Sequence, residues 1–434
     1  MTQPILAVAG NPVLHSRSPE LFNHALNHHQ IPAIYTRLLI QQVDELFTLW
    51  NGIGLTGLNI TTPLKEAVIP YLDELDPIAT KIRSVNLILR ENHHLIGYNT
   101  DYYGALNAIR SHQPVHSSMK GLVMGAGPAG RAAALALTEQ GLNVFLVNRS
   151  FDKAVTASLA IGCQPVPLSG LAAVTSQADI IISALSPGIQ LIQPQWIKPG
   201  CILLDANYKQ PGFQSLHLTP PQQIIPGLDW LIHQAVPSFQ YFTGQATTPK
   251  ILQHGLDIPG LKPRSHRIAL IGFMGSGKTT IARRLANLLG YNFLDLDHLI
   301  EQRLGQSIPQ IFQTQGESEF RRQESAILQD VIHQEQIVLA TGGGIVIDPV
   351  NRNCLNRYAV TCWLWVPLHI CMQRAQTQPC RPMLQNKSDE QIQHLYDNRS
   401  EYYAQASDLI VSYLSNVEQT ARNLYAEIHQ TFNH

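Results

Sequence analysis

Two glycine-rich stretches of the chain have the spacing of phosphate-binding loops, and they are of different kinds. The later one, GFMGSGKT at Gly272–Thr279, fits the pattern GxxxxGK followed by Ser or Thr, between the apolar run RIALI and a helical pattern. In such a loop successive backbone amides surround a β-phosphate, Lys278 reaches the β and γ oxygens, and Thr279 ligates Mg²⁺. The stretch therefore predicts a nucleoside-triphosphate site. The residues expected to bind this nucleotide are Gly275, Ser276, Gly277, Lys278, Thr279 and Thr280.

The earlier stretch, GAGPAG at Gly125–Gly130, follows an apolar strand pattern and opens an alanine-rich helix, and a second strand pattern, NVFLVN, comes next. The first glycine permits a tight turn, the second lets the backbone approach a pyrophosphate, and the third lets helix pack on strand. This order predicts a dinucleotide site.

The residues after NVFLVN favour NADP over NAD. An NAD enzyme places an acidic residue there, whereas this chain has Asn148, Arg149 and Ser150, with Lys153 nearby. An arginine at this place suits a 2′-phosphate. The alternative, that Arg149 is only a solvent-exposed residue at a helix start, stays open. The expected dinucleotide-binding residues are Gly125, Ala126, Gly127, Pro128, Ala129, Gly130, Asn148, Arg149, Ser150 and Lys153.

Three short polar motifs precede this turn. GNPVLHSRSP places Ser16 and Ser18 after the first strand pattern, and we expect their hydroxyls on the same side of an extended segment. GLNITTPLK ends in Lys65 and GYNTD ends in Asp101. Taken singly, such motifs are typical of turns and helix caps.

Charged residues also follow the triphosphate loop. FLDLDHLIE carries Asp295 and Asp297, which the alternation predicts on the same face of a strand end, and GESEFRRQE places Arg321 and Glu324 one helical turn apart. The run GGG at 342–344 lets the backbone approach a ligand closely. Further arginines stand in CRPMLQ, a segment typical of a mobile lid, and in DNRSEYY; they are Arg381 and Arg399. For each arginine a solvated helix face is the alternative.

The elements that must position these residues follow an α/β pattern. Short apolar runs alternate with amphipathic stretches, which is typical of parallel sheets covered on both faces. The alternation restarts at RIALIGFMG after the Pro- and Gly-marked segment Thr247–His266, so we expect a boundary near residue 260. Each part is long enough for a core of its own.

Composition excludes several partners. With 434 residues, a net charge of −1 and 14% charged residues, the chain has no basic field for nucleic acid or an anionic membrane. The six cysteines form no CxxC pair, which favours reduced packing residues in a cytoplasmic protein. We expect neither a signal peptide nor a membrane span, because no apolar stretch approaches about 20 residues.

The upstream motifs, in their order HSxSP, NxTxPxK, VN, NTD, GxGxxG and NRS, closely resemble shikimate dehydrogenase over residues 3–257. DWLIHQAVPSF resembles the C-terminal helix of that family with its glutamine. The resemblance implies that Lys65 and Asp101 are a catalytic pair and that Ser16 and Ser18 hold the substrate carboxylate. The residues implied to hold the carboxylate and hydroxyls are Thr61, Asn86, Tyr208 and Gln234. Those implied on the cofactor are Ala206, beside the nicotinamide, and Gly227.

Residues 266–430 resemble shikimate kinase. The resemblance implies that Asp297 meets the ring hydroxyls as a base or an orienting group, and that Asp295 assists Mg²⁺ together with Thr279. The groups implied to grip the substrate carboxylate and ring are Arg321, Arg399 and the backbone of Gly342, Gly343 and Gly344. Arg381 on the lid would stabilise the transferring phosphate and contact the nucleotide, and Arg374 would lie against adenine.

Together the resemblances predict an α/β chain with a two-lobed N-terminal unit and a C-terminal P-loop kinase domain with a parallel sheet. The expected parts are a substrate domain at 1–102 completed by 229–257, a Rossmann NADP domain at 103–228, a linker at 258–266 and the kinase domain at 267–434. The expected activity is bifunctional: 3-dehydroshikimate is reduced with NADPH, and shikimate is phosphorylated with ATP and Mg²⁺. The partners are small molecules, and an oligomer is not implied.

Two alternatives stay open. A sensor that binds these metabolites without turnover typically loses the catalytic lysine or the P-loop residues, and here Lys65, Lys278 and Thr279 are present. The enzymes could also take other substrates, quinate in the first part or another small polyol acid in the second. The pair Ser16 and Ser18 favours shikimate.

Overall fold

The computed structural model describes residues 3–213, 216, 223–376, 387–413 and 416–432. They pack into two compact units. The first unit consists of Met1–Leu26, Pro32–Thr62 and Leu256–His434, and the second of Asn27–Ile31 and Pro63–Gly255. These units follow from packing, whereas the expected domain limits follow from resemblance; the limits stay a prediction.

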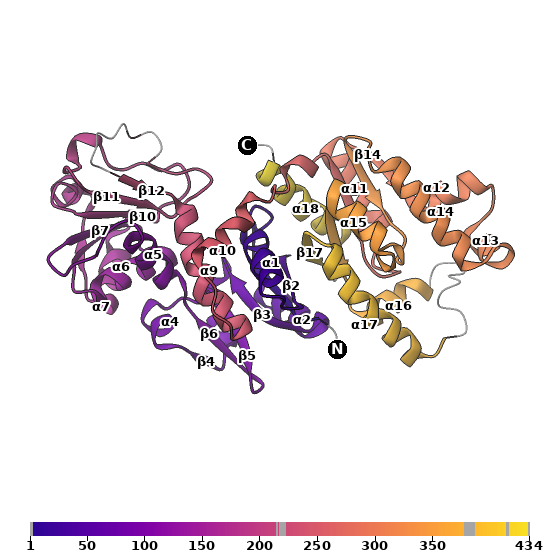
Figure 1. The fold of residues 1–434 in the computed structure, drawn as a ribbon, viewed down its shortest axis with the longest axis horizontal. Helices are drawn as coiled ribbons and strands as arrows, with labels where there is room; N and C mark the ends of the chain where they lie inside the picture. The colour runs from indigo at the N-terminus through magenta and orange to yellow at the C-terminus, as the bar shows by residue number, and fades with distance from the viewer. Residues whose placement is uncertain (1–2, 214–215, 217–222, 377–386, 414–415, 433–434) are drawn as a thin grey trace. The chain divides into compact units, whose positions relative to one another are not determined.

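A parallel sheet forms the centre of the first unit (Figure 1). The strands lie in the order β14 (Asn292–Asp295), β15 (Ile337–Ala340), β13 (Arg267–Ile271), β16 (Val360–Trp365), β17 (Leu409–Ser412), β2 (Ile34–Leu39), β1 (Ile5–Gly10) and β3 (Leu55–Ile60), each parallel to its neighbours. Most of their side chains are buried, as continuous apolar runs between two helical layers require.

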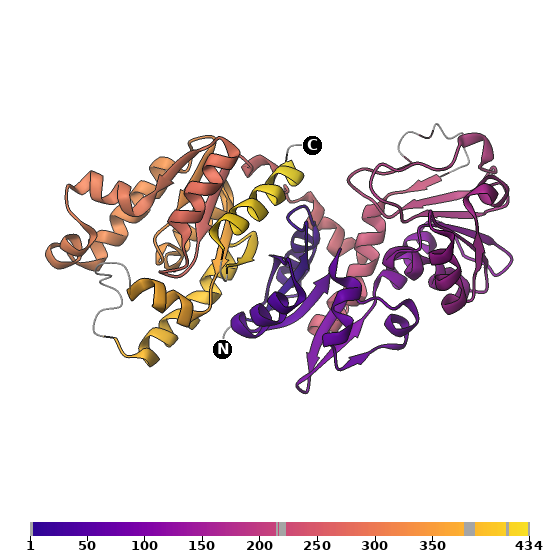
Figure 2. The same ribbon diagram turned by 180° about the vertical axis from the view of Figure 1, so that it is seen from behind.

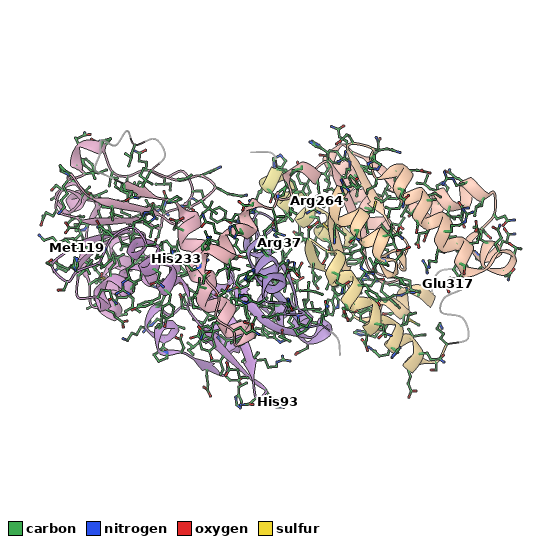
Figure 3. The ribbon with its side chains drawn as sticks, in the orientation of Figure 1. Arg37, His93, Met119, His233, Arg264 and Glu317 are labelled. Atoms are coloured by element: carbon green, nitrogen blue, oxygen red, sulfur yellow. The ribbon has the colours of Figure 1, made fainter. Side chains whose placement is uncertain are left out.

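Strands from opposite ends of the chain meet in this sheet. Ile410 and Val411 of β17 pair with Leu38 and Leu39 of β2, so the kinase-like part continues directly into the first strands of the chain. The segment before β13, expected as a linker, is anchored in the same unit because Arg264 donates two hydrogen bonds of 2.8 and 2.9 Å to the Asp408 carboxylate. Figure 3 labels Arg264.

Helices flank this sheet, as both views of the ribbon show (Figures 1 and 2). They are α1 (Ser18–His28), α2 (Val43–Ile53), α11 (Lys278–Leu289), α12 (Leu296–Leu304), α13 (Ile308–Thr314), α14 (Gly316–Val331), α15 (Pro349–Tyr358), α16 (Leu368–Gln376), α17 (Asp389–Ala406) and α18 (Val417–Phe432). Their apolar positions recur every three or four residues, so each helix presents one apolar face for burial.

The second unit contains a separate parallel sheet. Its order is β12 (Gln223–Ile225), β11 (Ile202–Asp205), β10 (Ile180–Ser183), β7 (Lys120–Met124), β8 (Asn143–Val147) and β9 (Gln164–Val166). The helices of this unit are α3 (Leu64–Ala67), α4 (Pro77–Ile82), α5 (Asp101–Arg110), α6 (Pro128–Glu139), α7 (Phe151–Ile161), α8 (Leu171–Thr175), α9 (Gly227–Thr243) and α10 (Pro249–His254). The expected α/β class with parallel sheets is confirmed.

One hairpin departs from the parallel pattern. β5 (Leu87–Glu91) and β6 (His94–Tyr98) are antiparallel, and β4 (Glu74–Leu75) is parallel to β6. The two residues between them, Asn92 and His93, both have positive φ, 46° and 71°. Such a turn matches the right-handed twist of a hairpin. Figure 3 labels His93 at its tip.

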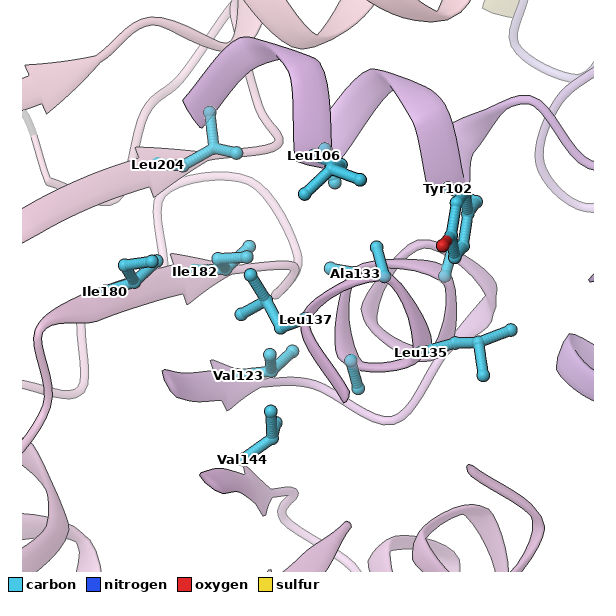
Figure 4. Close-up of a cluster of buried hydrophobic side chains, with 14 of the residues drawn as sticks. Tyr102, Leu106, Val123, Ala133, Leu135, Leu137, Val144, Ile180, Ile182 and Leu204 are labelled. Atoms are coloured by element: carbon cyan, nitrogen blue, oxygen red, sulfur yellow. The ribbon is translucent and has the colours of Figure 1, made fainter. Parts of the chain in front are cut away.

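Small side chains bring the helices of the second unit close to its sheet. The alanines of α6 are buried against Val123, Ile180 and Ile182 from the strands, and Leu106 of α5 covers the same cluster (Figure 4). A Cβ at Gly130 would lie 1.8 Å from the carbonyl oxygen of Gly125, so only glycine allows α6 this approach. No helix within the described ranges is long and apolar enough to cross a membrane.

Helices α5 and α9 meet at Gly104. A Cβ there would lie 2.6 Å from Cδ1 of Trp230 and 2.8 Å from Cβ of Gln234. Because Asp101 begins α5 and Gln234 lies on α9, this close crossing fixes the spacing of the two polar residues.

Replacing Gly104 with alanine should therefore destabilise the protein. A helix-interior Gly→Ala change by itself favours folding by about 1 kcal/mol, but overpacking costs about 1–3 kcal/mol, so we expect a net decrease in the urea midpoint. Asn107→Ala on the same helix adds no atom to the crossing, because asparagine already carries a Cβ, and it controls for helix propensity. A Gly104→Ala midpoint equal to or above that of wild type would contradict the crossing.

Candidate active sites

The dinucleotide-type turn lies between β7 and α6 and keeps one side open. Gly125 has φ of 107°, and a Cβ at Gly127 would meet nothing within 4 Å. Gly127 is the N-cap of α6, so the first amides of this helix face the open side. The side chain of Asn148 ties the end of β8 to the turn, since its Oδ1 accepts from the Ala126 amide at 3.2 Å. These features fit a bound pyrophosphate.

Cationic side chains stand beside this turn. Ser150 is the N-cap of α7, and Arg149 and Lys153 are exposed on either side of it. In the part of the chain that the structure describes, neither cation has an ion-pair or hydrogen-bond partner. An exposed, unneutralised arginine after the second strand fits a 2′-phosphate.

The loop after β11 is held by one buried carboxylate. Asp205 accepts hydrogen bonds from the amides of Asn207 at 2.9 Å and Gly212 at 2.6 Å, and burial raises the pKa of this carboxyl. The loop carries Ala206, which packs on the core of the second unit, and Tyr208. A Cβ at Gly227 would lie 3.0 Å from the Tyr208 amide nitrogen, so the structure brings Ala206, Tyr208 and Gly227 together. Asp205 was missed by sequence reasoning.

A second cluster contains the expected lysine and aspartate. Lys65 of α3 forms an ion pair with Asp101, the first residue of α5, and both side chains are largely buried. Asn86 donates to Asp101 Oδ1 at 2.9 Å and to Gln234 Oε1 at 3.3 Å. The Val85 amide donates to the Lys65 carbonyl at 2.8 Å, which holds the lysine segment beside Asn86. A positioned cation, a carboxylate and amide groups therefore converge within the second unit.

Two hydroxyl residues extend this network. Thr100 lies 3.0 Å from Asn86 Nδ2 through its Oγ1, and the same oxygen lies 3.0 Å from Ser238 Oγ on α9. Sequence reasoning did not single out either residue. Thr100 lies inside the NTD motif and was within reach of that reasoning, whereas Ser238 lies 138 positions further along the chain.

The expected substrate hydroxyls of the first unit are also neighbours. Ser16 Oγ donates to Ser18 Oγ at 3.2 Å and accepts from the Ser18 amide at 3.3 Å. The Thr61 amide donates to the Ala9 carbonyl at 2.9 Å, and a Cβ at Gly10 would lie 2.3 Å from Thr61 Cγ2, so Thr61 lies against the end of β1. The prediction that both serines lie on an extended segment is wrong for Ser18, which begins α1. The Ser16 hydroxyl accepts a hydrogen bond from the Ser18 amide, as the side chain of a helix-capping residue does.

The triphosphate-type loop follows β13 and leads into α11. Gly275 and Gly277 have φ of 82° and 85°, and a Cβ at Gly275 would lie 2.3 Å from the Cys371 carbonyl. Lys278 is only 8% exposed, and its Nζ donates to the carbonyls of Gly272 and Phe273 at 2.9 Å. Ser276 is buried, and Thr279 and Thr280 are exposed on the first turn of α11. The loop has the curled backbone and the inward lysine that a phosphate cradle needs.

The two aspartates after this loop lie on different elements. Asp295 ends β14 and caps α12, where its Oδ1 accepts from the amide of Asp297 at 3.1 Å. Its other oxygen accepts from Thr279 Oγ1 at 2.8 Å. The prediction that Asp297 shares a strand face with Asp295 is therefore wrong, because capping by Asp295 starts a helix and places Asp297 in its first turn.

The three glycines after β15 bring an acidic pair and an arginine together. A Cβ at Gly342 would lie 2.3 Å from Glu324 Oε1 and 3.1 Å from Asp297 Oδ1, and one at Gly344 would lie 2.4 Å from Arg321 Nη2. Arg321 donates to Glu324 at 2.7 Å. Burial raises the pKa of Glu324 to about 7; the nearby Arg321 opposes the rise and the charge of Asp297 adds to it.

Arg399 of α17 reaches the same place from the other side. It is 2% exposed and donates through Nη1 to the Gly343 carbonyl at 3.1 Å, and Tyr403 donates to the same carbonyl. Its Nε and Nη2 are buried and have no hydrogen-bond partner among the described residues. A buried guanidinium with two donors left over fits an anionic ligand, because such donors are costly to leave unpaired.

Two further arginines are expected to contact the nucleotide, and the structure describes one of them. Arg374 lies with its guanidinium 4.3 Å from the ring centroid of Tyr413, and a Cβ at Gly277 would lie 2.9 Å from that ring, so both residues flank the loop. Arg381, expected on the lid, lies outside the described residues, as does Met383 of the same motif.

Fold and clusters together define a chain with a dinucleotide-binding oxidoreductase part and a P-loop phosphotransferase part. Family profiles agree: "Shikimate dehydrogenase substrate binding domain" matches residues 8–88, "Shikimate / quinate 5-dehydrogenase" matches 108–203, and "Shikimate kinase" matches 274–431. The chain belongs to the shikimate dehydrogenase family over its N-terminal part and to the shikimate kinase family over its C-terminal part. Both resemblances seen in the motifs are confirmed.

Individual relatives agree with both assignments. A shikimate kinase of Aromatoleum aromaticum is 41% identical over 145 residues, which are 33% of this chain and 83% of the relative. A shikimate dehydrogenase (NADP(+)) of Bacillus cereus is 34% identical over 259 residues, 55% of this chain and 92% of the relative. The crystal structure of shikimate 5-dehydrogenase from Thermus thermophilus, in complex with NADP(H) and shikimate, is 28% identical with a TM-score of 0.53 and covers 59% of this chain and 99% of its own.

The buried Glu324 predicts a pH-dependent stability. Because its folded pKa of about 7 lies above the usual 4.5, the folded state holds a proton that the unfolded state has lost between these values. The stability that this carboxyl contributes is complete below about pH 4.5 and is lost as pH rises through about 7. Glu324→Gln keeps the side chain neutral at both pH values. The decrease in the free energy of unfolding between pH 5 and pH 8 should therefore be smaller than in wild type, by on the order of 1–3 kcal/mol.

The measurement is a series of urea unfolding curves monitored by tryptophan fluorescence. Glu319→Gln on the same helix is the control, because Glu319 pairs with Arg322 on the exposed face. An unchanged pH dependence in Glu324→Gln would show that this carboxyl does not hold the proton.

Proposed function

We propose that this chain catalyses two successive reactions. It reduces 3-dehydroshikimate to shikimate with NADPH, and it phosphorylates shikimate to shikimate 3-phosphate with ATP and Mg²⁺. The observation that carries the proposal is the presence in one chain of two assembled clusters, the Lys65–Asp101 ion pair and the Lys278 loop beside Asp297 and Arg399. The matching families are named for the same metabolite, so the product of one reaction is the substrate of the other.

When bound, NADPH would supply the hydride that reduces the carbonyl carbon of the substrate. The carbonyl oxygen then gains negative charge and needs a proton. Lys65 stabilises that charge and donates the proton, so that the carbonyl becomes a hydroxyl. Asp101 holds the Lys65 ammonium in place through their ion pair, and Asn86 orients Asp101 through the 2.9 Å hydrogen bond.

Binding of the two ligands of this reaction falls to the remaining polar groups. We propose that the substrate carboxylate and hydroxyls are held by Ser16, Ser18, Thr61, Asn86, Tyr208 and Gln234. The open side of the turn at Gly127 would receive the pyrophosphate, Arg149 and Lys153 the 2′-phosphate, and Ala206 and Gly227 the nicotinamide end. The choice of NADP is supported by the exposure of the two cations and by their lack of partners among the residues that the structure describes.

In the phosphorylation, ATP supplies the phosphoryl group, and Mg²⁺ would be held by Thr279 and Asp295, whose oxygens are of the type that it prefers. Lys278 would neutralise the β and γ oxygens, and Asp297 would orient or deprotonate the attacking hydroxyl. Arg321 and Arg399 would hold the substrate carboxylate, which is supported by the two buried Arg399 donors that have no partner among the described residues. Arg381 and Arg374 would contact phosphate and adenine. Positioning and charge neutralisation are what phosphoryl transfer requires.

Reciprocal lysine variants test the two assignments. Lys65→Ala should lower the kcat of shikimate oxidation by NADP⁺ by about 10²–10⁴-fold, the range of a lost general acid or base, and should leave ATP-dependent phosphorylation of added shikimate intact. Lys278→Ala should do the reverse. Rates are followed as NADPH absorbance and, separately, as ADP release.

Each variant is the control for the other, because both proteins retain the untouched site. A Lys278→Ala protein with a normal kinase rate would refute the P-loop assignment. Loss of both activities in either variant would mean that the two sites are not independent.

Arg149→Ala tests the cofactor. Loss of a charged contact to the 2′-phosphate should raise the KM for NADPH by about 10–100-fold, the effect of about 1.5–3 kcal/mol, and should leave the KM for NADH unchanged because NADH lacks that phosphate. Arg110→Ala, an exposed arginine at the end of α5, is the matched control. Equal effects on both cofactors would remove Arg149 from 2′-phosphate recognition.

A further inference from the structure

The loop between β1 and α1 is held by a carboxylate from the far end of the chain. Glu427 of α18 is 1% exposed and accepts hydrogen bonds from the amides of Val13, at 2.6 Å, and Leu14. Both ends of the chain belong to the first unit, and α18 lies beside this loop in both views of the ribbon (Figures 1 and 2). The two loop residues are themselves buried, so these amides depend on the protein for an acceptor.

The carbonyl side of the same loop is held by Arg37 of β2 (Figure 3). Its Nε and Nη2 donate to the Ser16 carbonyl at 3.0 and 2.6 Å, and its Nη2 also contacts the Glu20 carboxylate at 2.9 Å. Its Nη1 lies 3.4 Å from the carbonyl of Asp408, the residue before β17. Arg37 thus links the loop that carries Ser16 to the start of β17, the strand of the kinase part that pairs with β2.

The contacts of Glu427 and Arg37 restrict the conformation of the loop between β1 and α1. The Ser16 amide donates to the Val13 carbonyl at 2.9 Å, so Glu427 fixes the first residues of a turn whose last residue is Ser16. One carboxyl oxygen that accepts from two successive amides sets the direction of both N–H groups. Ser16 and, through their mutual hydrogen bond, Ser18 therefore take their positions from a turn that Glu427 closes.

We infer that Glu427, a residue of the kinase part, is a positioning residue of the dehydrogenase. The inference rests on the proposed function, in which Ser16 and Ser18 bind the substrate carboxylate. Glu427 does not touch the substrate; it presents the turn that does. The C-terminal helix thus sets the affinity of the first reaction for shikimate and 3-dehydroshikimate, and it has no part in cofactor binding or proton transfer.

The test uses the full chain with Glu427→Ala and Glu427→Gln. Steady-state oxidation of shikimate by NADP⁺, measured without ATP, gives kcat and the KM for each ligand; phosphorylation is measured separately. In Glu427→Ala we expect a KM for shikimate raised about 10-fold or more, with kcat and the KM for NADP⁺ within about twofold of wild type. Glu427→Gln keeps an oxygen acceptor of the same shape, so it should restore most of the affinity. Kinase parameters should stay within about twofold.

Glu418→Ala on the same helix is the control, since Glu418 pairs with Arg284 and Arg422 instead of the loop. Its KM for shikimate in the oxidation should match wild type. An unchanged KM in Glu427→Ala overturns the inference, and so does a parallel loss of kcat, cofactor affinity and kinase activity, which would mark a merely structural role. Wild-type protein without dehydrogenase activity would instead overturn the proposed function, on which the inference rests.

Discussion

A parallel sheet brings the carboxyl ends of all its strands to one edge, and the candidate chemistry of this chain depends on that constraint. In the first unit, the serine loop follows β1, Thr61 follows β3, the P-loop follows β13 and the three glycines follow β15. In the second unit, the glycine turn follows β7 and Asn148 follows β8. The strands are apolar and buried, so they fix the register of the sheet, while the loops that leave its edge are free to carry polar groups. Local motifs therefore become sites without contributing to the core.

The buried charged groups of the candidate sites differ in whether their hydrogen-bonding atoms have partners among the described residues. Asp101 has both Lys65 and Asn86 as partners, and Asp205 is satisfied by amides of its own loop. Arg399, in contrast, keeps two buried donors without an acceptor among the described residues, and burial raises the pKa of Glu324, with a smaller contribution from Asp297. Such groups cost stability when they stand alone. Their gathering around Gly342–Gly344 is why this cluster fits a small acid with hydroxyls, the ligand for which the kinase family is named.

The junction of the two families is itself part of the fold. β17 pairs with β2, Arg264 holds Asp408 in a bidentate ion pair, and Glu427 accepts from the loop after β1. The strand pairing and the Glu427 contact satisfy backbone groups of β2 and of the loop after β1 with residues of the kinase part. Under the proposed function, these contacts connect the C-terminal helix to the turn that carries Ser16 and Ser18. The contact affects the position of the loop between β1 and α1, and this loop leads to Ser16 and Ser18, the two residues expected to bind the substrate carboxylate.

The amino-acid sequence by itself determined the α/β class and both families, and it predicted both phosphate-type loops and the site residues Lys65, Asp101, Lys278 and Arg399. It did so because glycine spacing, apolar periodicity and motif order are local properties of the chain. It misplaced Asp297, since polar alternation cannot tell a strand end from a capped first helical turn. Only the tertiary structure decided that Ser238 joins Thr100, that Glu324 lies against Gly342 and that Glu427 holds Val13 across 414 positions. Such contacts depend on how sheets and helices pack, and no spacing within a motif encodes them.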